Sequence, residues 1–248
     1  MTPEILADII KSSKYIVALT GAGISTNAGI PDFRSKQGIY TTKKYRPEIF
    51  DIEYFMKDPS LFYDYAYDFF SFEKDISPTF AHYFLAALEK AGKLKTIITQ
   101  NIDGLHQKAG SKNIIEIHGG FDTGYCTLCL YRYNFSEIKN DILKRRKIPK
   151  CQKCKGVIKP NVVFFGEPVK DMEKAISEAR KSDLMLVIGT SLTVYPAAYI
   201  PESAVNKIAI LNKGEIGKKY PNAIIFQEDI DTFLKNISEM LNIHTHNQ

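Results

Sequence analysis

The sequence predicts an α/β fold, with a doubly wound, mostly parallel, Rossmann-like sheet and a smaller domain formed from two insertions. Short apolar runs without polar alternation recur along the chain, as expected for strands covered by helices on both faces. Helical segments lie between several of these runs. Four cysteines and a dense basic run fall in one stretch that breaks the alternation, which indicates an inserted module.

Six apolar runs are the expected strands: 15–19, 96–98, 114–117, 184–188, 208–211 and 223–226. The clearest helix is expected over 78–91, with Ser77 as its N-cap, Pro78 as its first residue and Gly92 at its end. The sequence Thr2-Pro3-Glu4 predicts a helix that begins near the start of the chain.

Two stretches interrupt the alternation of strands and helices. One is rich in aromatic and charged residues, and the other holds all the cysteines. We therefore expect a sheet domain made of 1–34, 77–121 and 160–248. The small domain would consist of a helical insertion, 35–76, and a zinc-ribbon-like module, 122–159.

The composition limits the class of protein. A chain of 248 residues suits one large domain, or one domain with an inserted module. Its 44% hydrophobic and 25% charged residues exclude a disordered, collagen-like or disulfide-dense chain. No apolar run approaches the roughly 18 residues needed to span a bilayer, and the acidic start does not resemble a secretory signal. We expect a cytoplasmic protein without membrane contact.

The cysteines form two pairs, Cys126-x2-Cys129 and Cys151-x2-Cys154, separated by 21 residues. Two such pairs at about this separation are typical of a zinc site with four thiolate ligands. Four protein ligands leave no open coordination position, which favours a structural ion, one per chain. A redox-active dithiol is the alternative, although such motifs usually occur as a single CxxC.

The net charge of +5 is concentrated beside these cysteines. Residues 139–159 contain nine cations and one anion, a net +8, so the other residues sum to −3. Zinc with four thiolates is formally −2, and nearby lysines would stabilise it. The remaining basic residues would form either an ordinary solvated face or a docking patch for an acidic partner.

Small or hydrogen-bonding residues follow five of the expected strands. They are Thr20-Gly21-Ala22-Gly23-Ile24-Ser25, Gln100-Asn101-Ile102-Asp103, His118-Gly119-Gly120, Gly189-Thr190-Ser191 and Asn212. Ligands of open parallel sheets bind beyond the carboxyl ends of the strands, so these residues should line one crevice.

Two features of this crevice suggest chemistry. Glycines at 21 and 23 are typical of a phosphate-binding loop, although a glycine-rich turn would look the same and the third glycine of the usual fingerprint is replaced by Thr26. His118 is the one histidine at a strand end, where an imidazole could accept a proton near neutral pH; a core or capping histidine is the alternative. The other four histidines are expected on helices, in turns or in the polar tail: His82, His106, His244 and His246.

Taken together, these motifs resemble those of the sirtuins, the NAD-dependent protein-lysine deacylases. The matching segments stand in the family's order from about residue 15 to 235: 21–25, 29–34, 99–106, 118–119, the two CxxC pairs, 160–167 and 189–192. The resemblance implies a minimal catalytic core that consumes NAD. It implies transfer of the acyl group to ADP-ribose, with release of nicotinamide, 2′-O-acyl-ADP-ribose and free lysine. His118 matches the general base, and Asn101 matches a second catalytic residue.

The resemblance also implies the ligand contacts. The residues matching NAD contacts are Ala22, Gly23, Ser25, Ile30, Phe33, Arg34, Tyr40, Gln100, Asn101, Ile102, Asp103, Gly189, Thr190, Ser191, Asn212, Lys213, Asp229 and Ile230. Those matching the segments that flank an acyl-lysine peptide are Val163, Phe165, Gly166, Glu167 and Val194. Acylated-lysine proteins or peptides are therefore the expected partners.

One variable stretch bears on the acyl group. Family members that remove acidic acyl groups carry a Tyr-x-x-Arg pair, and the matching residues here are Tyr63 and Ala66. Because alanine offers no cation, we expect neutral acyl groups to be preferred over succinyl.

Two other functions remain open, a protein ADP-ribosyltransferase using the same pocket and a zinc-ribbon nucleic-acid-binding module, although nucleic-acid binding is not expected. An NAD-sensing protein without catalysis would bind NAD and release no nicotinamide.

Overall fold

The computed structural model describes residues 2–32, 38, 41–42, 45–72, 75–145 and 148–245. Its strands are β1 Ile16–Thr20, β2 Leu94–Thr99, β3 Ile114–Glu116, β4 Gly119–Cys126, β5 Arg132–Asn134, β6 Ile158–Val162, β7 Leu184–Ile188, β8 Lys207–Leu211 and β9 Ala223–Phe226. Its α-helices are α1 Pro3–Ser12, α2 Ile52–Lys57, α3 Ser60–Phe72, α4 Phe80–Lys90, α5 Leu105–Lys108, α6 Phe135–Arg145, α7 Met172–Lys181 and α8 Ile230–Leu241. The 3-10 helices are η1 Ala22–Ala28, η2 Pro47–Phe50 and η4 Ala197–Ser203.

The predicted parallel sheet is confirmed. Six strands lie in the order β3-β2-β1-β7-β8-β9, and every neighbouring pair is parallel. Each of the six apolar runs overlaps one of these strands. The chain moves outward from β1 in one direction through β2 and β3, then returns to pair β7 with the other side of β1. This reversal is the topological switch point at which α/β sheets open a crevice for ligands.

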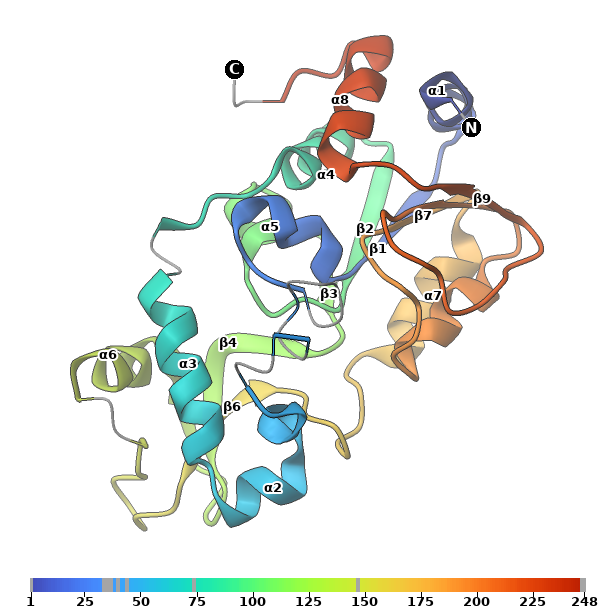
Figure 1. Cartoon of the computed structure of the whole chain (residues 1–248). Coiled ribbons are helices and arrows are strands. Elements are labelled where there is room, and N and C mark those ends of the chain that lie inside the picture. Colours follow the sequence, from blue (N-terminus) through green and yellow to red (C-terminus); the bar gives the residue numbers. More distant parts are fainter. Residues whose placement is uncertain are drawn as a thin grey trace.

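Helices cover both faces of the sheet. One apolar cluster joins α1, α4 and α8 to one set of alternating strand residues, including Ala18, Leu186 and Leu211. A second cluster joins α7 and η4 to the opposite set, including Leu19 and Val187. Because side chains alternate across a strand, runs without polar residues are buried on both sides. Figure 1 shows α1, α4 and α8 grouped together, with α7 on the other side of the strands.

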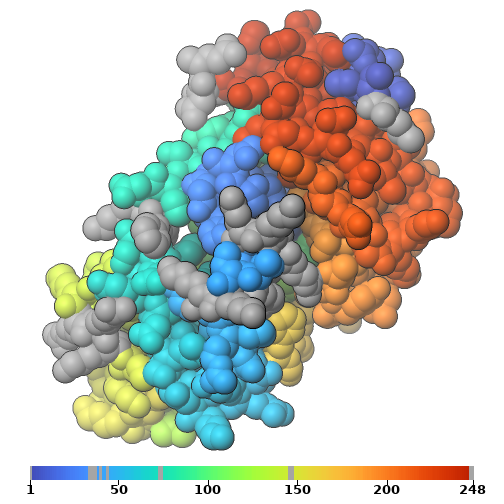
Figure 2. Space-filling model, in the orientation of Figure 1, coloured from blue at the N-terminus to red at the C-terminus, as the bar shows by residue number. Residues whose placement is uncertain are grey.

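The smaller lobe has its own sheet and core. A three-stranded antiparallel sheet in the order β5-β4-β6 packs with α2, α3 and α6 (Figure 1). Its core is largely aromatic and joins residues of 49–70 to residues of 121–164. Figure 2 shows this lobe, in cyan and yellow, beside the larger lobe in green, orange and red. Both β4 and β6 extend beyond the predicted insertion 122–159, since they continue into the chain on either side.

The helix predicted over 78–91 begins later than expected. α4 starts at Phe80, and its N-cap is Thr79 rather than Ser77. Thr79 Oγ1 lies 2.8 Å from Nδ1 of His82, and that nitrogen accepts a hydrogen bond from the Thr79 N–H at 3.2 Å. His82 therefore closes a capping box in place of the usual acid or amide. Pro78 precedes the cap, while Gly92 follows the helix with a positive φ of 73°.

No helix in the described part of the chain is long and apolar enough to cross a membrane.

Candidate active site

The crevice forms where the loops after β1 and β7 meet. Gly23 donates its N–H to the carbonyl of Gly189 at 2.8 Å. A Cβ at Gly23 would lie 2.8 Å from Cα of Gly189, and one at Gly21 would lie 2.7 Å from Cβ of Thr190. The glycines are therefore required by this loop-to-loop contact, whether or not a phosphate also approaches them. Sequence reasoning missed this constraint.

His118 lies in the turn between β3 and β4, two residues beyond the end of β3. Its Nδ1 is 2.9 Å from the carbonyl oxygen of Gln100. A carbonyl oxygen only accepts, so Nδ1 carries the proton and Nε2 keeps its lone pair. Burial lowers the pKa of His118 and the bond to Gln100 opposes that shift. The ring is thus neutral at neutral pH and oriented to accept a proton at Nε2.

Polar side chains tie the β2 end to the β1 and β7 loops. Gln100 Nε2 donates to Thr190 Oγ1 at 3.1 Å. Asn101 Nδ2 donates to the carbonyl of Gly21 at 3.1 Å and to Ser25 Oγ at 3.3 Å. The structure therefore brings the polar residues predicted at three different strand ends into one hydrogen-bonded group.

Asp103 also belongs to this group. Its Oδ2 accepts from Ser25 Oγ at 2.7 Å, and its Oδ1 accepts from the N–H of Leu105 at 3.0 Å, at the start of α5. Burial raises the pKa of Asp103, and these two bonds partly oppose the shift. Asp103 thus caps the start of α5 with one carboxylate oxygen and bonds to the strand-end residue Ser25 with the other.

A second polar network lies behind the crevice. Thr20 Oγ1 donates to Thr99 Oγ1 at 2.9 Å and lies 2.9 Å from His106 Nε2, and Thr99 Oγ1 accepts from the N–H of Asn101. The His106 ring packs 4.7 Å from the ring of His82. Both histidines are buried, and burial lowers the pKa of His82 to about 2 and that of His106 to about 4. The structural role expected of these histidines fits this placement, although no sequence pattern indicated that they meet.

The residues predicted near adenosine have their own local bonds. Asn212 Nδ2 donates to the carbonyl of Gly214 at 3.0 Å, and Lys213 is exposed. Asp229 is the N-cap of α8 and accepts from the N–H of Thr232 at 3.1 Å, a bond that lowers the pKa of its carboxyl. Ile230 is buried in the core of the large lobe. Local capping thus accounts for Asp229 and core packing for Ile230.

Three further NAD candidates are described by the structure and three are not. Ser191 Oγ lies 2.9 Å from Thr193 Oγ1. Ile30 is half-buried, and Ile102 packs against the aromatic core of the small lobe. The other three lie outside the described residues: Phe33, Arg34 and Tyr40.

The segment predicted to bind a peptide joins the two lobes. Val163 donates its N–H to the carbonyl of His118 at 2.8 Å. Phe165 donates its N–H to the carbonyl of Phe50 and accepts from the N–H of Ile52, while its side chain is 49% exposed. The segment is therefore attached to the His118 turn on one side and to the small lobe on the other.

Three other residues complete this region. Gly166 has a φ of 91°, where an L residue would be strained. Glu167 turns its carboxylate inward, where Oε2 accepts from Lys159 Nζ and from the N–H of Phe164, both at 2.8 Å. Val194 is half-buried after β7. Lys159 is one of the nine cations counted in 139–159, but it is only 1% exposed, so the expectation of a solvated or docking face is wrong for this lysine.

The four cysteines converge in the small lobe. Their sulfur atoms all lie within 4.8 Å of one another, with Cys126 and Cys154 at 3.3 Å and Cys129 and Cys151 at 3.7 Å. These separations are too long for disulfides and near the ~3.8 Å expected between thiolates that each lie ~2.3 Å from a tetrahedral zinc ion. The Tyr133 hydroxyl donates to Cys151 and lowers the pKa of that thiol to about 6. The donor set fits zinc.

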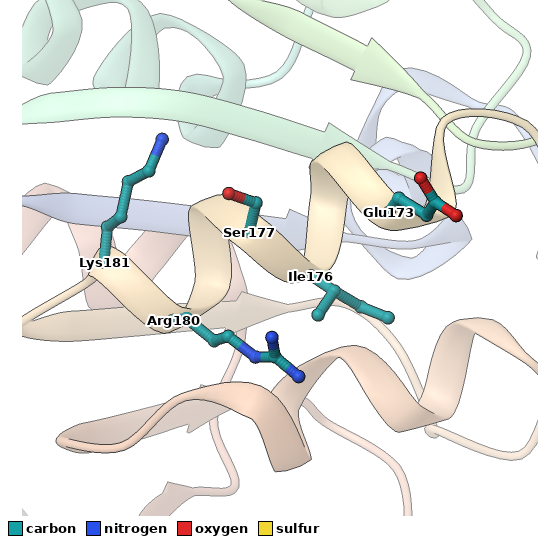
Figure 3. A pocket seen from close by; sticks show the side chains of 5 residues that line it. All are labelled: Glu173, Ile176, Ser177, Arg180 and Lys181. Atoms are coloured by element: carbon teal, nitrogen blue, oxygen red, sulfur yellow. The ribbon is translucent and has the colours of Figure 1, made fainter.

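A surface hollow of about 460 Å³ lies elsewhere, along α7. Figure 3 shows its lining, which consists of Glu173, Ile176, Ser177, Arg180 and Lys181. None of these residues belongs to the strand-end group, and Lys181 is paired with Glu178 of the same helix at 2.6 Å. The candidate site therefore lies at the strand ends and not in this hollow.

Sequence and structure comparisons with known proteins agree on one protein family. The sequence matches the Sir2 family over residues 21–196. An NAD-dependent protein deacetylase of Saccharolobus solfataricus is 48% identical over 246 residues, which cover 96% of this chain and 97% of that protein.

Solved structures agree over nearly the whole chain, and three of them each cover 98% of it and 100% of their own chains. A Sir2 complex with a deacetylated p53 peptide and 3′-O-acetyl-ADP-ribose has a TM-score of 0.89 at 38% identity. Sir2 with a p53 peptide and NAD+ has a TM-score of 0.86 at 37% identity. Sir2Tm bound to a propionylated peptide has a TM-score of 0.86 at 36% identity.

Proposed function

This chain belongs to the Sir2 family and is an NAD-dependent protein deacetylase, and from that premise we propose how its residues perform the reaction. The acyl group of a modified lysine is transferred to the ADP-ribose part of NAD. One water molecule is consumed to release the lysine amine, and the products are nicotinamide, 2′-O-acyl-ADP-ribose and free lysine. Neighbouring structures with 3′-O-acetyl-ADP-ribose and with 2′-O-acetyl-ADP-ribose support products of this kind.

His118 is the general base. The observation that carries this role is the bond between its Nδ1 and the carbonyl of Gln100, because this bond holds the tautomer whose Nε2 can accept a proton. The lowered pKa keeps the ring neutral at neutral pH. Since the Gln100 N–H donates to the carbonyl of Thr20, the backbone that orients the base is itself fixed to β1. The proton taken by Nε2 comes from a ribose hydroxyl.

NAD would be held along the strand-end group, and it supplies an activated ribose carbon that accepts the acyl group as nicotinamide leaves. The phosphates and the nearby ribose would be held by Ala22, Gly23, Ser25, Gly189, Thr190 and Ser191. The reacting ribose and the nicotinamide would be held by Ile30, Gln100, Asn101, Ile102 and Asp103. The adenosine would be held by Asn212, Lys213, Asp229 and Ile230. Asn101, buried and bonded to Gly21 and Ser25, orients the ribose beside the base.

The peptide would lie along the segment from Val163 to Glu167, with Val194 on its other side. Apolar side chains there suit the neutral stem of an acylated lysine, and the exposed ring of Phe165 offers apolar contact. Neighbours bound to acetylated and propionylated peptides support acylated lysine as the substrate class. Main-chain contacts of this type tolerate varied substrate sequences.

Neutral acyl groups should be preferred over succinyl. Ala66 is fully buried in the aromatic core, and the Tyr63 hydroxyl donates to the carbonyl of Ile158, so neither supplies a cation for a second carboxylate. The test is the ratio of kcat/KM for acetylated and succinylated versions of one peptide. Equal values would contradict the preference.

The four cysteines of the two CxxC pairs would hold one structural zinc ion in the small lobe. Bound there, it would cross-link the two CxxC pairs, and four thiolate ligands would leave no open coordination position for substrate. We further propose that the protein acts in the cytoplasm.

Mass spectrometry of a reaction with an acetylated peptide tests the mechanism. We expect lysine, nicotinamide and acetylated ADP-ribose with NAD, and no deacetylation without it. His118→Ala should lower kcat/KM by about 10²- to 10⁴-fold, the usual contribution of a general base. His244→Ala, in the exposed tail, is the matched control and should leave the rate unchanged.

Two results would overturn this assignment. One is deacetylation without NAD, and the other is full activity of a folded His118→Ala variant. Label from NAD that ends on protein instead of acetylated ADP-ribose would favour the ADP-ribosyltransferase.

A further inference from the structure

Lys159 is a buried cation in a place where a lysine is costly. It belongs to β6, and its side chain is only 2% exposed. Moving an ammonium group out of water costs several kcal/mol unless it is paired and hydrogen-bonded. Burial lowers the pKa of Lys159, while Glu167 raises it again. The groups around Lys159 should therefore show what holds its charge there.

The partners of Lys159 come from both ends of one short segment. Its Nζ donates to the carbonyl of Val162 at 2.7 Å and to Glu167 Oε2 at 2.8 Å, and lies 4.1 Å from the centre of the Phe164 ring. Glu167 Oε2 also accepts from the N–H of Phe164 at 2.8 Å. The ammonium group and the carboxylate thus close a ring of contacts across residues 162–167.

Two more bonds connect this ring to the rest of the site. The Tyr125 hydroxyl, on β4, reaches Glu167 Oε1 at 3.4 Å. Val163, inside the ring, donates its N–H to the carbonyl of His118 at 2.8 Å. The segment is therefore hydrogen-bonded to the turn that carries the base, and a buried charge pair connects its two ends.

We propose that Lys159 is a positioning residue for the acylated peptide: it holds the Glu167 carboxylate and so keeps residues 163–167 in the shape that receives the substrate. This inference rests on the proposed function. It assigns Glu167 an internal role, in which the carboxylate organises its own segment instead of meeting the peptide directly. Among the described residues, neither the Lys159 ammonium group nor the Glu167 carboxylate is hydrogen-bonded to a residue proposed to hold NAD, so NAD binding should be spared.

Lys159→Met tests the proposal, since methionine keeps most of the length and removes the charge. We expect the KM for an acetylated peptide to rise about tenfold or more, as the loss of a charged hydrogen bond implies, while the KM for NAD changes less than about twofold. Lys159→Arg keeps the charge and should restore part of the peptide affinity. Glu167→Gln should act in the same direction as Lys159→Met. Lys144→Met, exposed on α6, is the matched control and should change neither KM.

The variants separate positioning from general loss of stability. A merely structural role would lower Tm and reduce the amount of active enzyme without splitting the two KM values. If Lys159→Met fails to fold, Lys159→Arg and Glu167→Gln carry the same comparison. An unchanged peptide KM in folded variants, or an equal rise in both KM values, overturns the proposal.

Failure of the proposed reaction would be recognised separately. Binding of a fluorescent acetyl-lysine peptide to the full chain, measured by anisotropy without NAD, requires no turnover. We expect weaker binding by Lys159→Met and not by Lys144→Met. If the native chain binds the peptide but releases no nicotinamide from NAD, the proposed function fails while the role of Lys159 stands. If the native chain does not bind the peptide, the role of Lys159 fails as well.

Discussion

The two lobes reach stability by different means. The large lobe surrounds a six-stranded parallel sheet with aliphatic side chains on both faces. The small lobe has three strands, and its core is built from rings such as Phe50, Phe62, Phe70 and Phe164 in edge-to-face or tilted contact. It also contains the four-cysteine cluster. A small core is often insufficient by itself and is then cross-linked by a metal or disulfide. We therefore expect the small lobe to be the part that depends on a ligand.

The two lobes contribute different parts of the candidate site. The residues proposed for NAD come mainly from the sheet, whose strand ends are fixed by a continuous hydrogen-bonded ladder. The peptide segment is attached to the small lobe, because Phe164 lies in its aromatic core and Phe165 is bonded to Phe50 and Ile52. Damage to the small lobe should therefore weaken peptide binding before it weakens NAD binding.

Metal removal should have the largest effect. Structural zinc contributes about 10–16 kcal/mol of apparent binding free energy in zinc-finger peptides at neutral pH, so Cys151→Ser or a strong chelator should unfold the small lobe and abolish deacetylation. The measurements are zinc content by mass spectrometry and thermal unfolding. Gln152→Ala, exposed between two of the cysteines, should retain one zinc per chain. A native chain without zinc that is fully active would refute the dependence.

Truncation within the aromatic core should come next. Phe62 is 1% exposed and contacts the rings of Phe50, Phe55 and Phe164. Phe62→Ala should lower the free energy of unfolding by about 3–5 kcal/mol and raise the peptide KM more than the NAD KM. Leu88→Ala, in the core of the large lobe, should cost about 2–5 kcal/mol without this split. Equal effects on peptide KM would remove the distinction between the lobes.

Acid should act on the large lobe through its buried histidines. The folded pKa values of His82 and His106 lie near 2 and 4, below the unfolded value of about 6.5, so the unfolded chain binds more protons in mildly acidic solution. Stability is therefore full above pH 6.5 and falls as the pH drops below it. Each histidine should cost about 2 kcal/mol between pH 7 and pH 5.

His82→Gln tests this dependence through denaturant unfolding at the two pH values. The variant loses its capping histidine and should be less stable at pH 7, but its stability should fall by about 2 kcal/mol less than that of the native chain between pH 7 and pH 5. His244→Ala serves as the control, since this exposed histidine should leave the slope unchanged. Identical slopes for His82→Gln and the native chain would contradict the assignment of buried, neutral rings.

Tyr63→Phe should produce the smallest change. It removes the hydrogen bond from the Tyr63 hydroxyl to the carbonyl of Ile158, which links α3 to β6 inside the small lobe. The cost should be about 1 kcal/mol in chemical denaturation, the usual net value of one such bond. Tyr83→Phe, on the half-buried side of α4, should stay within about 0.5 kcal/mol of the native chain. A neutral Tyr63→Phe would indicate that the aromatic ring alone supports this contact.

Local patterns predicted much of the fold and the four-cysteine cluster. Buried strands require uninterrupted apolar runs, so all six strands of the large sheet could be located from residue types alone. Two CxxC pairs predicted the convergence of four thiols. The position of His118 after a strand indicated that it would lie at the sheet's ligand-binding edge, and its turn beyond β3 lies there.

Other features could not be predicted because they depend on partners distant in the sequence. The start of α4 was misplaced since Ser77 is as good a cap as Thr79 until His82 supplies the reciprocal bond. His106 meets Thr20, 86 residues away, and no pattern records that contact. Lys159 looked like one more cation in a basic run, whereas the fold places its ammonium group beside Glu167.

The sequence by itself determined which strands form the large sheet, which four thiols gather into one cluster and which histidine stands at a strand end. These properties follow from residue type and short spacing, through burial of apolar runs, the softness of thiolates and the pKa of imidazole. Only the tertiary structure decided the tautomer of His118, the internal pairing of Glu167 and the attachment of the peptide segment to the small lobe. Each of these depends on a hydrogen bond between groups brought together by packing, and a hydrogen bond requires a partner within about 3 Å.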